Sequence, residues 1–284
     1  MRRLFYILFF FICSTIITHD CRAEDWEEIK SEHFVVYFTK DRKFAVDVLD
    51  KAEVYYKRIA ADLGYPRYSD FWTWDKRVKI YIYPDHGSFI KATNQPEWSY
   101  GMADYRTKQI VSFAWSENFV ESLLPHEMTH LIFRDFVGFK GEIPLWLDEG
   151  VAQWEEETKR YEMKNAVKRL YEEDTILSLR DMMKLNIMQI KDLRKTFILS
   201  TMTKRGERAS LILGTNNLID IYYLQSVSLV GFLIEKYGSD SFAVFCRQLR
   251  DGKSLDEALR FSYPTHIQNL NEFEKKWREY IAQY

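Results

Sequence analysis

Residues 123–130 read Leu-Leu-Pro-His-Glu-Met-Thr-His and contain the pattern H-E-x-x-H. In a helix, His126 and His130 lie four residues apart, so their imidazoles share one face, one turn above the other. Two imidazoles placed in this way can hold one zinc ion, and Glu127 beside them can take a proton from a water. Pro125 lacks an N–H and is expected to kink this helix or to start a new one.

A third ligand is needed, because a catalytic zinc site has at least three protein ligands and an open position. Eighteen residues separate His130 from Glu149, which lies within Trp-Leu-Asp-Glu-Gly-Val-Ala at 146–152. Pro144 favours the start of a helix, which places Glu149 in the second turn, able to face the first helix. Its neighbour Asp148 has two open interpretations: it hydrogen-bonds a ligating imidazole, or it faces solvent.

Composition indicates a folded globular protein. Of the 284 residues, 46% are apolar and 16% are aromatic, which is enough for a substantial core. The formal net charge of −2 excludes the strongly basic surface that nucleic-acid binding requires.

The first residues are typical of a secretory signal. Arg2 and Arg3 precede an apolar run at 4–17, which is short for a transmembrane helix, and Ala23 ends a small-x-small cleavage pattern. We expect residues 1–23 to be removed and the mature protein to be exported, without stable membrane insertion. A retained N-terminal anchor is the alternative.

Cysteine usage points to the same ligand set. Only Cys246 remains after residue 23, so an internal disulfide is impossible and thiolate ligation is not expected. Cys246 itself lies in an apolar helical pattern and is expected to be a buried core thiol.

Periodicity divides the chain into a mixed half and a helical half. The predicted strands and helices of the first half are 33–38, 44–63, 77–83, 88–93, 100–105, 109–115 and 118–137 in chain order. Helices are then expected from Pro144 onward and over 220–237, 242–249, 255–261 and 267–284, with no strand and with a long loop over 191–216. The pattern predicts an α+β fold.

The two motifs together resemble the gluzincin metallopeptidases of the peptidase MA-like superfamily. The resemblance implies a zincin-like fold over 24–284, with an α/β lobe at about 24–138, a mainly helical lobe at 139–284 and the active-site cleft between them. His126, His130 and Glu149 would hold one Zn²⁺, and Glu127 would be the general base. The implied activity is hydrolysis of peptide bonds in a peptide or protein.

A later helix adds to the resemblance. In related gluzincins, such a helix carries a tyrosine that stabilises the oxyanion, and Tyr223 matches it best. Tyr222 and His266 are the alternatives for this role, and both tyrosines could instead be core aromatics. His33, His86 and His266 are otherwise expected to be surface or capping residues.

One departure favours internal cleavage. The aminopeptidase branch carries G-x-M-E-N, whose glutamate holds the substrate amine, whereas this chain has Gly-Met-Ala-Asp-Tyr at 101–105. An endopeptidase is therefore expected. In the family, the strand before the motif helix is often an edge on which the substrate lies extended, so the resemblance implies that 110–115 is this edge. The acidic run at 155–157 is expected to be a solvated helix face, and a preference for basic substrates is the alternative. Two other functions stay open: a non-catalytic binding or envelope-scaffold protein, and a metallohydrolase with a non-peptide substrate.

Overall fold

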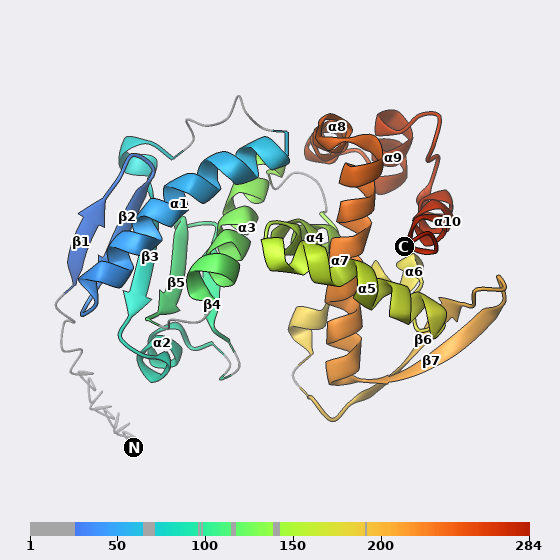
Figure 1. The fold of residues 1–284 in the computed structure, drawn as a ribbon, viewed down its shortest axis with the longest axis horizontal. Coiled ribbons are helices and arrows are strands. Elements are labelled where there is room, and N and C mark those ends of the chain that lie inside the picture. Colours follow the sequence, from blue (N-terminus) through green and yellow to red (C-terminus); the bar gives the residue numbers. More distant parts are fainter. Residues whose placement is uncertain are drawn as a thin grey trace, which may run out of the picture.

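The structure is a computed structural model. It describes residues 26–64, 72–95, 97, 99–114, 118–138, 143–190 and 192–284. The predicted secretory signal, residues 1–23, lies outside the described residues. Figure 1 shows a mixed α/β arrangement in the N-terminal half and a mainly helical arrangement in the C-terminal half, which confirms the predicted fold class.

The N-terminal half is organised around a five-stranded sheet with the order β1-β2-β3-β5-β4. Strand β3 lies in the centre and pairs in parallel with β2 on one side and β5 on the other. The edge strands are antiparallel, with β1 paired to β2 and β4 paired to β5. The strands are β1 (Glu27–Lys30), β2 (Phe34–Phe38), β3 (Val78–Tyr83), β4 (Gly101–Asp104) and β5 (Gln109–Phe113). Strand β1 was not predicted.

Helices cover both faces of this sheet. The long helices α1 (Arg42–Asp62) and α3 (Leu124–Val137) lie on one face, and the short α2 (His86–Thr93) lies on the other (Figure 1). Strand alternation explains the two layers, because Val78, Ile80 and Ile82 enter the main core while Tyr81 and Tyr83 pack toward α2.

The C-terminal half is built around α7 (Thr215–Tyr237), a largely apolar helix that packs against its neighbours over most of its length (Figure 1). The other helices are α4 (Leu145–Trp154), α5 (Glu157–Glu172), α6 (Leu179–Met182), α8 (Ser239–Arg250), α9 (Leu255–Ser262) and α10 (Leu270–Ile281). Helix α7 has the length and apolar composition of a membrane span, but 67% of its apolar 18-residue stretch is buried inside the protein. Cys246 on α8 is a buried thiol in the core, as predicted.

The prediction of a strandless loop over 191–216 is wrong. Strands β6 (Thr196–Met202) and β7 (Arg208–Gly214) form an antiparallel hairpin that leads directly into α7. Apolar residues occupy both faces of β6, since Phe197 points toward the core and Ile198 points outward. These apolar outward positions weaken the apolar–polar alternation that identifies a strand in the sequence.

The prediction that the strand at 110–115 is a sheet edge is also wrong. Strand β5 has β3 on one side and β4 on the other, so β4 is the edge. The chain reverses between β4 and β5 with Lys108 in a left-handed conformation (φ 51°), which lets β4 return along the free side of β5. Trp115 lies outside the described residues.

Pro125 lies at the start of α3, the second of the two predicted outcomes. A π-helical turn at Phe119–Leu123 precedes α3, and Pro125 occupies its first turn, where a missing N–H is tolerated. The register from His126 onward is regular α-helix. His33, expected at the surface, is buried, and its Nδ1 lies 2.7 Å from Glu53 Oε2.

Candidate metal centre

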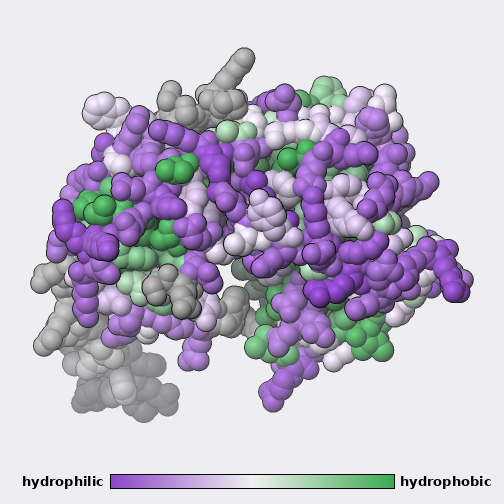
Figure 2. Space-filling view, viewed as in Figure 1, coloured by the Kyte–Doolittle hydropathy of each residue, from purple (hydrophilic) through white to green (hydrophobic). Residues whose placement is uncertain are grey.

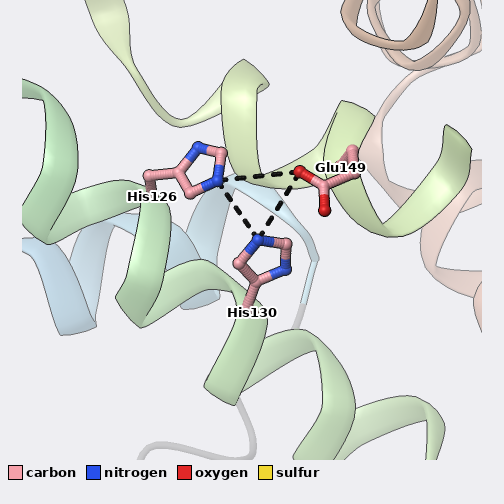
Figure 3. A group of neighbouring side chains, drawn as sticks. All are labelled: His126, His130 and Glu149. Carbon is pink, nitrogen blue, oxygen red and sulfur yellow. Dashed lines mark hydrogen bonds and ion pairs between the residues drawn. The ribbon is translucent and has the colours of Figure 1, made fainter. Parts of the chain in front are cut away.

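Three side chains converge at the meeting point of α3 and α4. His126 and His130 lie one turn apart on α3, and Glu149 lies in the second turn of α4, as the sequence predicts. Figure 3 shows the two imidazoles and the carboxylate pointing toward one another. The two Nε2 atoms are 3.2 Å apart, and each lies 3.8 Å from Glu149 Oε2.

These distances suit a small metal ion. For a triangle with these three sides, the point equidistant from the three atoms lies about 2.1 Å from each, which matches zinc–nitrogen and zinc–oxygen bonds of about 2.0–2.2 Å. A set of two imidazoles and one carboxylate leaves a further position open. The three residues therefore form a group that could hold a metal ion.

Each imidazole is oriented by a carboxylate on its other nitrogen. His126 Nδ1 lies 2.8 Å from Glu156 Oε1, and His130 Nδ1 lies 3.2 Å from Asp148 Oδ1. A proton shared on Nδ1 leaves Nε2 free to bind a metal, and the carboxylate makes the imidazole a stronger ligand. Asp148 is in turn held by Arg134, whose Nη2 donates to Asp148 Oδ2 over 2.7 Å. Of the two interpretations of Asp148, the structure shows the hydrogen bond to an imidazole, that of His130, and not a side chain that faces solvent.

The acidic run at 155–157 corrects the prediction of a solvated face. Glu155 and Glu156 are buried, and only Glu157 is exposed. The run forms the junction between α4 and α5, which two arginines hold in place. Arg58 on α1 donates to the Glu155 carbonyl oxygen over 2.6 Å, and Arg160 donates to Glu155 Oε2 over 3.0 Å. This junction places Glu156 beside His126.

Glu156 also accepts a hydrogen bond from the turn that precedes α3, where the hydroxyl of Ser122 donates to Glu156 Oε2. Burial raises the pKa of Glu156, but hydrogen bonding and the charge of His126, together with Lys159 and Ser122, lower it overall. Glu156 thus stays an anion that can accept a proton from the imidazole. Sequence reasoning missed this role, because Glu156 lies outside α4 at the junction with α5 and helical spacing from Glu149 does not extend to it.

The position of Glu149 depends on close contact between α4 and α7. A Cβ added to Gly150 would lie 2.4 Å from the carbonyl oxygen of Ser226 and 2.8 Å from Val230 Cγ2. Only glycine permits this approach, so the glycine of the motif is explained by helix packing. Tight packing at Gly150 holds the adjacent Glu149 toward α3.

Glu127 lies beside the three candidate ligands and lines the same cavity. It is buried, with 8% of its surface exposed. Burial raises the pKa of Glu127 above its ordinary value, although His126 and His130 oppose the rise. A carboxylate whose pKa is raised in this way is a better proton acceptor at neutral pH.

The surroundings of the ligands are electronegative. Burial alone would lower the pKa of His130, but Asp148, Glu149 and Glu127 raise it to about 10. In the absence of a metal, such carboxylates favour a proton on the imidazole. The same field favours a divalent cation at this position.

A cavity of about 830 Å³ opens onto this group. Edge strand β4 lines one side with Met102 and Ala103, and α5 and α7 line the other side with Met163 and Leu224 among others. The cavity therefore lies between the mixed half and the helical half of the chain.

Of the three candidates for an oxyanion donor, only Tyr223 reaches the cavity. Burial raises the pKa of Tyr223, and Glu149 and Glu127 raise it further, so the phenol keeps its proton. Tyr222 is fully buried and is not among the residues that line the cavity. His266 lies at the surface, stacked 5.2 Å from Tyr237, and lines a different hollow.

Comparison with models of known protein families finds no family that matches this chain, and comparison with curated proteins finds no match.

Proposed function

We propose that this protein is a zinc-dependent metallopeptidase of the gluzincin type that cleaves peptide bonds within a chain. The observation that carries the proposal is the convergence of His126, His130 and Glu149 on one point, with the buried Glu127 beside them. This combination of ligands and base is the one that metal-assisted hydrolysis requires.

The ligand chemistry favours zinc. Two imidazoles and a carboxylate are a known catalytic zinc set, and both imidazoles have the carboxylate partners that zinc-binding histidines commonly show. When bound, zinc supplies a Lewis acid that polarises a carbonyl and lowers the pKa of a water toward about 7.

Glu127 would act as the general base. It accepts a proton from the water whose oxygen forms a bond with the scissile carbonyl carbon, and it then delivers that proton to the amide nitrogen as the carbon–nitrogen bond breaks. The phenol of Tyr223 would donate a hydrogen bond to the carbonyl oxygen as negative charge develops there. The raised pKa of Tyr223 suits this role, because a donor must stay protonated.

The substrate would bind along β4. This strand is the sheet edge, and Met102 and Ala103 line the cavity beside the ligands. An extended peptide can add to such an edge through main-chain hydrogen bonds. The segment 101–105 lacks the glutamate that would bind a substrate amine, so internal cleavage is favoured. The predicted secretory signal at 1–23 favours export from the cytoplasm as the location.

The proposal is tested by metal analysis followed by cleavage of a peptide library. Purified protein is expected to contain one zinc per chain, and His130→Ala is expected to lose it. Glu127→Gln is expected to keep the zinc and to lose at least about 100-fold in kcat, because a general base contributes about 10²–10⁴.

The outcomes separate the alternatives. A chain that holds iron and no zinc would contradict the proposal. A zinc-loaded chain that cleaves no member of a diverse library would favour the scaffold or the non-peptide hydrolase.

A further inference from the structure

The hairpin of β6 and β7 presents apolar side chains to solvent. Ile198 and Ile212 are cross-strand partners, and they are 76% and 73% exposed. Phe197 and Leu211, on the opposite face, pack against the core. Figure 2 shows apolar residues among hydrophilic ones at the lower right, where Figure 1 places the hairpin. Exposed isoleucines paired on a sheet face are unusual in a surface that meets only water.

Positive charge surrounds this apolar pair. Residues 192–214 contain five basic and two acidic residues, a local charge of +3 in a chain whose net charge is −2. The basic residues are Arg194, Lys195, Lys204, Arg205 and Arg208. They lie at the base of the hairpin and at its tip, on both sides of the isoleucines.

The tip arginines are available for a partner. Arg205 and Arg208 are exposed and form no ion pair with any residue in the described parts of the chain, whereas Lys204 is paired with Glu172 over 3.1 Å. Arg208 lies opposite Met202 in the register and shares the outward face with Ile198 and Ile212.

The outward face carries no carboxylate. Its side chains are aliphatic, hydroxylic or basic; the outward positions are Thr196, Ile198, Ser200, Met202, Arg208, Ser210, Ile212 and Gly214. This combination suits the surface of a bilayer with anionic headgroups. The aliphatic side chains can enter the boundary of the acyl chains, the hydroxyls can lie at the depth of the headgroups, and the cations on both sides can pair with the anionic headgroups. We propose that the outward face of the β6–β7 hairpin docks the protein on a membrane surface that contains anionic phospholipid.

Docking would also fix the position of the cavity. Strand β7 runs directly into α7, and Tyr223 on α7 lines the cavity. The hairpin and the candidate metal centre are thus connected through α7. The proposal does not depend on the nature of the reaction, and its test measures binding alone.

The test is sedimentation with vesicles of phosphatidylcholine, with or without about one quarter phosphatidylglycerol. Wild type is expected to bind the anionic vesicles and to be released by salt, because surface charges are screened. Arg205→Gln with Arg208→Gln is expected to weaken binding about 25-fold, since each cation near the surface contributes about five-fold. Ile198→Ser with Ile212→Ser is expected to weaken it at least about tenfold.

Matched controls isolate the hairpin. Lys253→Gln with Lys275→Gln removes two exposed cations elsewhere, and Val54→Ser removes an exposed apolar side chain on α1. Both controls are expected to bind as wild type does. All proteins are expressed in the same way and have the same N-terminus, so the leader contributes equally, and circular dichroism checks that each variant is folded.

Two results would overturn the proposal. One is equal binding of wild type and both hairpin variants to anionic vesicles. The other is no vesicle binding by wild type; if self-association were then lost on Ile198→Ser with Ile212→Ser, the face would be assigned to a second copy of the chain.

Discussion

Replacing Gly150 by alanine is expected to disturb the metal centre through helix packing alone. The added Cβ would lie 2.4 Å from the carbonyl oxygen of Ser226, whereas real contacts of this kind are not shorter than 3.0 Å. Helices α4 and α7 must therefore separate by about 0.6 Å or more. The obstacle is backbone and not the end of a flexible side chain, so it cannot simply rotate away.

The displacement affects Glu149 directly, because it is the next residue. Ligands must be held to within about 0.5 Å of a productive geometry, so we expect zinc affinity to fall about 10–100-fold. Overpacking costs about 1–3 kcal/mol, and alanine contributes about 1 kcal/mol over glycine in a helix, so the free energy of unfolding should fall by about 0–2 kcal/mol. The effect on the metal is thus expected to be clearer than the effect on stability.

The assay is zinc competition with a chelator, together with denaturant unfolding of the metal-free protein. Gly87→Ala in α2 is the matched control, since its Cβ would meet only Asp85 Oδ1, at 3.3 Å. That variant should keep the zinc affinity of wild type. If Gly150→Ala also kept the affinity of wild type, the argument that α4–α7 packing positions Glu149 would be refuted.

Three further predictions concern single side chains. Glu156→Gln should weaken zinc binding about 10–100-fold in the same competition assay, while the exposed Glu157→Gln should leave it unchanged. Tyr223→Phe should keep its zinc but lose about 100-fold in kcat, and an unchanged kcat would exclude the phenol as the oxyanion donor. Burial raises the pKa of Glu53, but hydrogen bonds from Ser31 and His33 bring it below the ordinary glutamate value of 4.5. Its carboxylate therefore stabilises the fold above pH 4.5, and this stabilisation is lost as the pH falls through the lower pKa of the folded state. In urea unfolding, the difference in stability between wild type and Glu53→Gln should therefore shrink below pH 4.5. A difference that stays constant with pH would contradict the assignment.

The sequence by itself determined the parts of the site that depend on local geometry. Helical spacing brings His126 and His130 to one face, and a helix starting near Pro144 brings Glu149 into its second turn. The same reasoning located the central strands and α7, because their periods are strong. It also placed Glu127 next to the ligands, which required only its position in the chain.

Tertiary structure decided what depends on partners distant in the chain. Glu156 reaches His126 because Arg58 and Arg160 hold the α4–α5 junction, and Arg58 lies about a hundred residues before that junction. The sequence predicts a solvated face for the three glutamates at 155–157, because the burial of an acid depends on partners that lie elsewhere in the chain and that the local sequence pattern does not show.

The sheet edge and the hairpin were decided in the same way. Whether β4 or β5 forms the edge depends on which strand pairs with the free side of β5, and residue composition leaves that choice open. Ile198 and Ile212 weakened the polar alternation of β6 and β7, so the hairpin became visible only through its pairing and its packing on the core. Spacing along a helix is set by covalent geometry, whereas pairing between elements is set by the complete fold.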